Sequence, residues 1–277
     1  MCGHVFAMEV PVKMKHLIAL VLGLCLPLQA ADPFFSFAME SSVFDQTTFP
    51  VVARHFTSGD YLGWKALRRI PALESVIPTS HQFQFSYDVG GVQTSVRNCS
   101  PGAPGWIYYH WGVSGKTPAN EMTDPATAVS RAAAIAHAGS CRRFGLVPEG
   151  GFFGASGCSA ATGGAPFQKI DWSVVDAVDI TVSGLLRDSC PGDSRVETYV
   201  NATKSIAGFI RGRNRNIIIT AHFSFDETAP MTMVAAAQAL KSSVDGFQLA
   251  YPMNGSRKRK YCSASNLEMV LSGLRQR

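Results

Sequence analysis

The sequence predicts an α/β protein built as a closed (β/α)8 barrel of the TIM type, with one strand irregular or missing from the pattern. Short apolar strands alternate with longer helices at a spacing of roughly 35 residues, which is typical of parallel strands joined by right-handed crossovers. The chain that follows an N-terminal leader is close in length to the ~250 residues of such barrels. The glycine-rich strand–turn–helix fingerprint of nucleotide-binding open sheets is absent, which disfavours the rival three-layer sheet.

The composition is that of a folded domain. Of the 277 residues, 46% are hydrophobic and 16% are charged, which excludes a disordered tail. The 25 glycines and 15 prolines exclude a coiled coil. Beyond the leader the excess positive charge lies in one run, Arg257–Lys260. A nucleic-acid partner is not expected, because nucleic-acid binders spread such charge over a face. The run is either a solvated loop or a contact for an anion or an acidic glycan.

Residues 1–30 are predicted to be a secretory signal peptide with its upstream residues. Lys15 precedes an apolar run from Leu17 to Leu28, and the small residue Ala30 ends the segment. The alternative of a membrane anchor is disfavoured, because the run is too short to cross a bilayer core of roughly 30 Å. We therefore expect cleavage after Ala30, a single barrel domain over 31–277, a secreted or periplasmic location and no stable membrane anchor.

The expected strands are short apolar runs, often β-branched or aromatic, at 51–56, 83–87, 106–111, 144–148, 177–182, 217–223 and 244–251. The eighth strand is expected within 34–44 or is irregular. Helices are expected at 62–73, 125–138, 196–211, 230–242 and 266–274. The second of these has the clearest boundaries, with Asp124 as N-cap, Pro125 in the first turn and Gly139 at the end. The glycine-rich stretch 150–164 is expected to be a loop.

Several segments between Trp106 and Pro252 carry a resemblance. They read Y-Y-H-W-G with T-P-A-N-E-M-T-D-P, G-L-V-P-E-G, I-D-W-S-V-V-D-A-V-D-I, I-I-I-T-A-H-F-S and V-D-G-F-Q-L-A-Y-P. This pattern resembles secreted TIM-barrel proteins of the glycoside-hydrolase-like kind, in architecture and in the chemistry of the strand ends. Chitinase-type barrels carry D-x-x-D-x-D-x-E, whereas here Asp176 and Asp179 are followed by Thr181 and Ser183. Either that likeness is chance, or this strand has lost that chemistry.

The candidate site follows from the barrel, since the loops at the carboxyl ends of the strands converge on one face. The candidate catalytic residues at strand ends are Glu149, Asp88 and His110, and the candidate substrate-binding residues are Trp111, His222 and Tyr251. Glycoside hydrolysis needs two carboxylates beside the bond. Glu149 is the predicted acid/base and Asp88 its weaker partner, although Glu149 could instead begin a solvated loop.

The histidines and the serine at the strand ends give little support for a metal site or for a serine nucleophile. His110 and His222 could bind a metal across the barrel, but no H-x-H or H-x-x-x-H pair supplies a recognisable ligand spacing. No metal and no cofactor are therefore predicted. Ser224 lies outside any G-x-S-x-G elbow, so a serine nucleophile is not expected.

The working hypothesis is a secreted carbohydrate-active barrel that acts as a glycoside hydrolase-like enzyme on a carbohydrate substrate. Its rival is a non-catalytic barrel that binds a glycan or another protein at the same mouth. Fold alone does not decide between them, so the choice depends on the site.

The cysteines give a disulfide prediction. The leader contains Cys2 and Cys25, and an exported chain without a C-x-x-C pair can form disulfides. In a barrel, Cys99 and Cys141 precede neighbouring strands, whereas Cys158, Cys190 and Cys262 follow strands. The sequence therefore predicts Cys99–Cys141 and Cys158–Cys190, with Cys262 left as a thiol. The alternatives are that Cys262 competes for a partner on its face or that Cys141 is a buried thiol.

Overall fold

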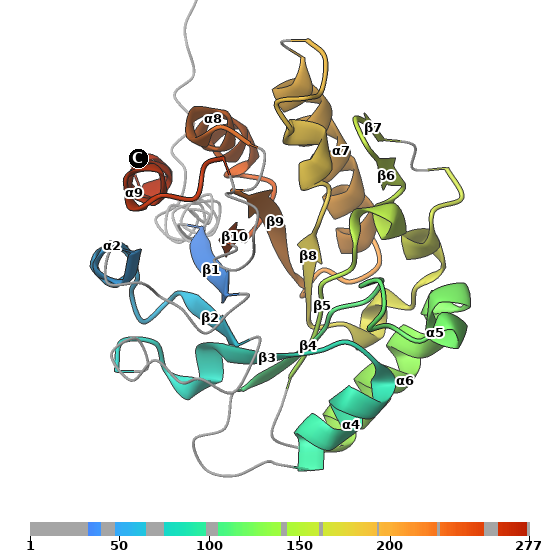
Figure 1. Ribbon diagram of the computed structural model, residues 1–277. Helices are drawn as coiled ribbons and strands as arrows, with labels where there is room; N and C mark the ends of the chain where they lie inside the picture. Colours follow the sequence, from blue (N-terminus) through green and yellow to red (C-terminus); the bar gives the residue numbers. More distant parts are fainter. Residues whose placement is uncertain are drawn as a thin grey trace, which may run out of the picture. The chain divides into compact units, whose positions relative to one another are not determined.

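A closed barrel of eight parallel strands forms the centre of the compact unit Asp32–Arg277. The computed structural model describes residues 33–39, 48–64, 75–97, 105–139, 143–160, 163–192, 194–225, 228–251 and 260–275. Around the barrel the strands follow the order β1-β10-β9-β8-β5-β4-β3-β2, and the ends of the sheet meet where β1 pairs with β2. Figure 1 shows the helices outside this ring. The predicted (β/α)8 fold is confirmed, and the predicted signal peptide lies outside the described residues.

The barrel strands are β1 (Phe34–Met39), β2 (Tyr61–Trp64), β3 (Gln82–Ser86), β4 (Trp106–Tyr109), β5 (Arg143–Leu146), β8 (Ala177–Ile180), β9 (Ile218–Ser224) and β10 (Gly246–Tyr251). The described helices are α2 (Thr48–His55), α4 (Val89–Arg97), α5 (Ala119–Thr123), α6 (Pro125–Ala138), α7 (Arg195–Arg211), α8 (Pro230–Leu240) and α9 (Ala264–Arg275). Between β5 and β8, short 3₁₀ turns and an antiparallel hairpin, β6 (Ala155–Ser156) and β7 (Ser159–Ala160), take the place of an α-helix.

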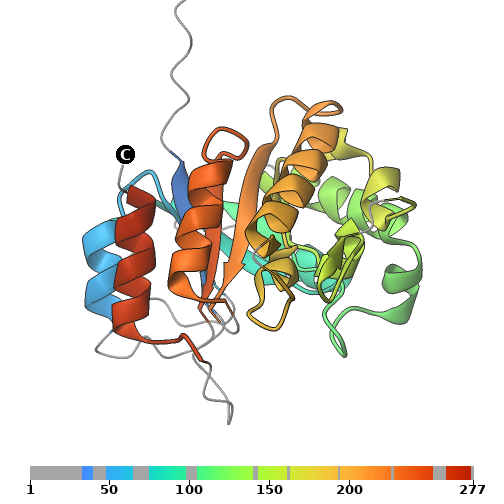
Figure 2. The same ribbon diagram turned by 90° about the horizontal axis from the view of Figure 1, so that it is seen from above.

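Local sequence explains the best-defined helix boundary. The side chain of Asp124 accepts a hydrogen bond from the backbone N–H of Thr127, and Pro125 occupies the first helical turn of α6. Both features favour the start of a helix, because the first backbone N–H groups have no partner within the helix. Asp124 supplies a partner for one of them, and Pro125 has no N–H group. The predicted range of this helix is therefore confirmed. Figure 2 shows α2, α9, α8 and α7 side by side along one flank of the barrel.

The prediction of a strand at 51–56 is wrong, because Thr48–His55 forms α2. Val51 and Val52 favour strands by intrinsic propensity, but tertiary context decides between the two structures here. The valines are buried, and α2 also forms an ion pair with α9 in which Arg54 contacts Glu268 at 2.5 Å.

The prediction of a helix over 62–73 is wrong at its start, where Tyr61–Trp64 forms strand β2. Residues 65–74 lie outside the described part of the chain. Gly63 explains how β2 fits beside β3, because a Cβ at this position would lie 2.1 Å from the ring of Phe83. The missing strand is β1, which begins at Phe34 as the sequence suggests.

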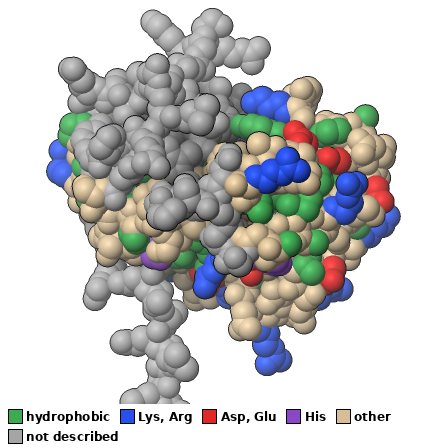
Figure 3. Space-filling view, turned by 90° about the horizontal axis from the view of Figure 1, so that it is seen from below, with side chains coloured by type: hydrophobic (Ala, Val, Ile, Leu, Met, Phe, Trp, Pro, Cys, Tyr) green, Lys and Arg blue, Asp and Glu red, His purple; other side chains and the backbone are tan. Residues whose placement is uncertain are grey.

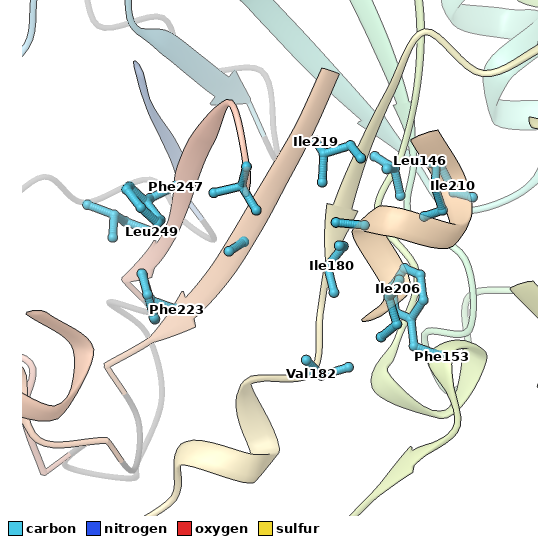
Figure 4. Close-up of a cluster of buried hydrophobic side chains, with 14 of the residues drawn as sticks. Leu146, Phe153, Ile180, Val182, Ile206, Ile210, Ile219, Phe223, Phe247 and Leu249 are labelled. Carbon is cyan, nitrogen blue, oxygen red and sulfur yellow. The ribbon is translucent and has the colours of Figure 1, made fainter. Parts of the chain in front are cut away.

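The alternation of side chains along each strand produces two apolar layers. Outward-facing residues pack under the helices, and Figure 4 shows Leu146, Ile180 and Ile219 turned toward Ile206 and Ile210 of α7. A separate cluster lies inside the barrel: Phe83, Phe85, Trp106, Tyr108, Val147 and Ala177. Because Trp106 and Tyr108 point inward, His110, the residue after Tyr109, also lies on the inner face of the barrel.

One disulfide, Cys158–Cys190, joins the hairpin that follows β5 to the loop that follows β8, with a Cα–Cα distance of 5.3 Å. This bridge is one of the two that the sequence predicts. Cys262 is a thiol whose Sγ lies 3.8 Å from the carbonyl oxygen of Phe225. The predicted bridge between Cys99 and Cys141 lies outside the described residues.

Removal of this disulfide is expected to lower the free energy of unfolding. The two cysteines are 32 residues apart in the sequence, and closing a loop of this length stabilises a fold by about 3–4 kcal/mol in the chain-entropy model. Urea unfolding of the Cys158→Ser, Cys190→Ser double variant measures the loss. An unchanged midpoint and slope would contradict a stabilising role for the bridge.

The surface has mixed charge on the face that Figure 3 shows, where Lys and Arg side chains are dispersed among acidic and apolar ones. No helix within the described residues combines the length and apolar character needed to cross a membrane.

Candidate functional site

Four neighbouring strands of the barrel place polar side chains on its inner face toward the carboxyl end. In barrel order, His110 follows β4, Glu149 follows β5, Asp179 lies in β8 and His222 lies in β9. Trp106 and Tyr108 of β4 belong to the interior cluster, so His110, two residues further on, faces the same way. These four residues, here called the polar arc, form two histidine–carboxylate pairs.

The first pair contains a fully buried carboxylate. Asp179 is 0% exposed, and its Oδ2 lies 2.6 Å from Nδ1 of His222. Its other oxygen, Oδ1, accepts a hydrogen bond of 2.8 Å from the hydroxyl of Thr220. An ionised carboxylate only accepts hydrogen bonds, so Nδ1 of His222 carries the proton. The opposite ring nitrogen, Nε2, is thereby held in the form that can accept a proton.

The backbone of this histidine is fixed from the helical layer. The hydroxyl of Tyr199 in α7 donates a 3.0 Å hydrogen bond to the carbonyl oxygen of His222. Burial, and next the charge of Asp179, raise the pKa of Tyr199 well above its usual value, so its hydroxyl remains a donor. The imidazole is held by its ring nitrogen and by its own main chain, and its side chain keeps 15% exposure.

The second pair is more open to solvent. Nε2 of His110 lies 3.2 Å from Oε1 of Glu149, and the two side chains are 14% and 54% exposed. The ring of Tyr87 stacks against His110 with a centroid distance of 5.6 Å. Gly112 makes room for Glu149, because its φ of 88° is in the left-handed region and a Cβ there would lie 3.2 Å from the Cβ of Glu149. A proton can pass between a histidine and a carboxylate at this separation.

Asp88 has a structural contact that the sequence analysis did not assign. Its Oδ1 accepts a 2.6 Å hydrogen bond from the backbone N–H of Gly91, at the start of α4. This is the geometry of a helix N-cap. Asp88 therefore positions the start of α4, and we do not propose it as the second carboxylate of the site.

Trp111 lies in the apolar layer rather than at the mouth. Its side chain is buried, its Nε1 donates to the carbonyl oxygen of Glu121 at 2.9 Å, and its ring packs against Phe152. A buried indole has no open face on which a sugar can stack, so the predicted substrate-binding role is not carried forward. Tyr251 is the last residue of β10, and its side chain lies outside the described part of the structure.

Sequence reasoning missed two of the buried carboxylates, Asp179 and Glu121. Asp179 is the single charged residue in the strand A-V-D-I, and a charge in an apolar strand signals a paired group. Glu121 accepts 3.2 Å hydrogen bonds from the backbone N–H of Val89 and a 2.6 Å bond from the hydroxyl of Tyr109. Burial and the bond to Glu121 raise the pKa of Tyr109. Glu121 thus connects α5, β4 and the start of α4, away from the polar arc.

The polar arc can perform proton transfer. It contains one imidazole oriented by a buried carboxylate and one half-exposed carboxylate in contact with a second imidazole, the groups that general acid–base catalysis uses. Within the described residues, no group of three or more His, Cys, Asp or Glu side chains is placed to hold a metal ion.

Comparisons with known proteins concern the fold. No protein-family model and no curated protein sequence matches the chain. A flavocytochrome b2 variant with benzoylformate is similar over 88% of this chain and 62% of its own, at 12% identity and a TM-score of 0.47. The carboxyl transferase domain of pyruvate carboxylase from Rhizobium etli is similar over 87% of this chain and 46% of its own, at 8% identity and a TM-score of 0.46.

A weaker likeness is to an α-L-fucosidase variant in complex with 4-nitrophenyl-α-L-fucopyranoside, over 67% of this chain and 79% of that one, at 9% identity and a TM-score of 0.25. The chain spans less than two thirds of the flavocytochrome and pyruvate carboxylase chains. The proteins named in these comparisons are enzymes, and at these identities the likeness carries no information on the reaction of this chain.

Proposed function

We propose that this protein is an exported carbohydrate-active enzyme of the glycoside-hydrolase kind, which uses the polar arc for acid–base chemistry. One observation carries the proposal: His222 is oriented by the fully buried Asp179 on the same inner face that carries Glu149 and His110. Keeping a charged carboxylate out of water is costly unless it is paired and hydrogen-bonded. If Asp179 orients the imidazole of His222, this role explains why the fold retains a buried carboxylate at this position.

The four residues have distinct roles in hydrolysis of a glycosidic bond, in which His222 takes the place of the second carboxylate that most glycoside hydrolases use. Asp179 has both oxygens engaged and does not reach substrate, so it orients His222. Nε2 of His222 takes a proton from water as the water oxygen bonds to the anomeric carbon. The bond from that carbon to the leaving oxygen breaks, and Glu149 delivers a proton to the leaving oxygen. His110 contacts Glu149 and supports its return to the protonated form.

The surroundings of the arc support a sugar ligand. The half-buried ring of Tyr87 lies beside His110, and Nζ of Lys116 is 4.2 Å from the centre of that ring. Aromatic rings with adjacent polar groups provide the apolar face and the hydrogen bonds that a sugar ring uses in protein sites. The proposed substrate is therefore a carbohydrate, and no cofactor is required for this reaction.

Export is part of the proposal. The leader pattern in residues 1–30 has the three parts of a secretory signal. The disulfide between Cys158 and Cys190 supports an oxidising compartment, because disulfides persist outside the reducing cytosol. N-terminal sequencing of the exported protein tests this point, and we expect Ala31 as the first residue.

A glycoside screen tests the catalytic proposal. Wild-type protein and the Glu149→Gln, His222→Gln double variant are incubated with a panel of 4-nitrophenyl glycosides and reducing oligosaccharides. We expect the wild type to cleave at least one member and the double variant to cleave none. Binding of an oligosaccharide by both proteins without cleavage by the wild type would favour the rival, a non-catalytic glycan-binding barrel.

A further inference from the structure

Thr181 follows strand β8 directly, two residues after Asp179. In barrel order, β8 lies between β5, which Glu149 follows, and β9, which contains His222. The side chain of Thr181 is partly buried, and its hydroxyl contacts the chain segment that leads to Glu149. Thr181 therefore follows the strand that separates the proposed acid, Glu149, from the proposed base, His222.

The peptide bond that precedes Glu149 is held from two sides. Its carbonyl oxygen, which belongs to Pro148, accepts a hydrogen bond from the hydroxyl of Thr181. Its N–H group, which belongs to Glu149, donates to the carbonyl oxygen of Trp111 at 2.9 Å. Because a peptide group is planar, it cannot turn without breaking one of these two hydrogen bonds. The backbone that enters Glu149 is thus fixed by the segments that follow β8 and β4.

The backbone that leaves Glu149 is held as well. A Cβ on Gly150 would lie 3.0 Å from the carbonyl oxygen of Thr181, so residue 150 passes close to this oxygen. The carbonyl oxygen of Glu149 accepts a 2.9 Å hydrogen bond from the N–H group of Phe152. The side chain of Glu149 is 54% exposed, so close packing restrains it little. The backbone that carries Glu149 therefore has a large part in placing its carboxyl group.

We infer that Thr181 is a positioning residue, whose hydroxyl fixes the peptide before Glu149 and thereby sets where the Glu149 carboxyl meets the leaving oxygen. This inference rests on the proposed function, in which Glu149 delivers a proton to that oxygen. Such a transfer needs the two oxygens within about 2.6–3.2 Å of each other. A displacement of roughly 1 Å can lower the rate by a factor of about 10². Thr181 acts through Glu149, because its hydroxyl donates to Pro148.

The test compares Thr181→Val, which keeps the shape of threonine without its hydroxyl, with Thr181→Ser, which keeps the hydroxyl. The substrates are the phenyl and 2,4-dinitrophenyl glycosides of the sugar that the wild type cleaves. Phenoxide needs a proton to leave, so Thr181→Val is expected to lower kcat/KM on the phenyl glycoside roughly tenfold to a hundredfold. Dinitrophenoxide leaves without a proton, so the loss on that glycoside should be less than about threefold. Thr181→Ser should stay within about threefold of the wild type on both substrates.

Two further variants complete the comparison. Thr181→Ala also lacks the hydroxyl and should show the same dependence on the leaving group as Thr181→Val. Glu149→Gln removes the acid itself and should show that dependence with a larger loss. If it does, equal losses on the two glycosides for both hydroxyl-free variants, or no loss on either, would overturn the inference and leave the proposed function intact. A wild type that cleaves neither glycoside, or a Glu149→Gln variant whose loss is the same on both, would overturn the inference together with the proposed function.

Discussion

Asp179→Asn is expected to lower kcat/KM on the cleaved glycoside by about 10²–10⁴. The carboxylate is fully buried and fixes the proton of His222 on Nδ1 through a 2.6 Å contact. An asparagine can turn its NH2 group toward Nδ1, which would move the imidazole proton to Nε2. The atom that accepts the proton from water would then be blocked. Steady-state kinetics and far-UV circular dichroism together measure this effect in a folded variant.

The chain contains a matched control for this substitution. Asp176 lies directly before β8, and its Oδ2 accepts from Nε2 of His137 at 2.9 Å and from the backbone N–H of Phe144 at 2.8 Å. This pair has the same chemistry as His222 with Asp179, but it lies at the amino end of the strand. Asp176→Asn should therefore reduce stability without lowering kcat/KM. Equal activity losses in the two variants would contradict a specific role for Asp179.

Glu149→Gln is expected to lower kcat by about 10²–10⁴, the usual contribution of a positioned acid or base. Glu149 is 54% exposed, so the glutamine is accommodated and the loss reports proton transfer rather than folding. Glu197→Gln serves as the control, because Glu197 is an exposed carboxylate in the first turn of α7, outside the barrel.

Chemical rescue distinguishes proton transfer from a structural effect at Glu149. Glu149→Ala leaves space for a small anion, and added azide or formate should restore part of the activity if the missing group acts on the reacting bond. Activity of Glu149→Gln within a factor of about three of the wild type would remove Glu149 from the mechanism.

Most of the fold could be predicted from the sequence, through the short apolar runs typical of strands and the residues that mark helix boundaries. Asp124 with Pro125 marks a helix start by local chemistry alone, and the runs that became β3, β4, β5, β8, β9 and β10 are short, apolar and separated by turn residues. The segment between β1 and β2 was predicted incorrectly. Val51 and Val52 favour a strand by propensity, but they are helical in the structure. As a helix, this segment buries both valines and packs against α9 from the other end of the sequence.

The candidate site was only partly predictable. His110, Glu149 and His222 follow from the rule that strand ends meet at one face of a barrel. Which of them pair was not predictable, since the 3.2 Å contact of His110 with Glu149 depends on the turn at Gly112. Asp179 was considered only as part of a motif that the chain does not complete. Trp111 follows a strand yet faces the helices, because inward and outward positions alternate residue by residue.

A crystal structure of the Glu149→Gln variant with its bound glycoside tests the central claim most directly. The proposal predicts a sugar at the carboxyl end of the barrel, with its glycosidic oxygen within roughly 2.6–3.2 Å of the residue 149 amide. A water between the anomeric carbon and Nε2 of His222 is expected in the same complex. A sugar bound at the amino end of the barrel, or on the outer surface away from His222 and residue 149, would contradict the proposed function.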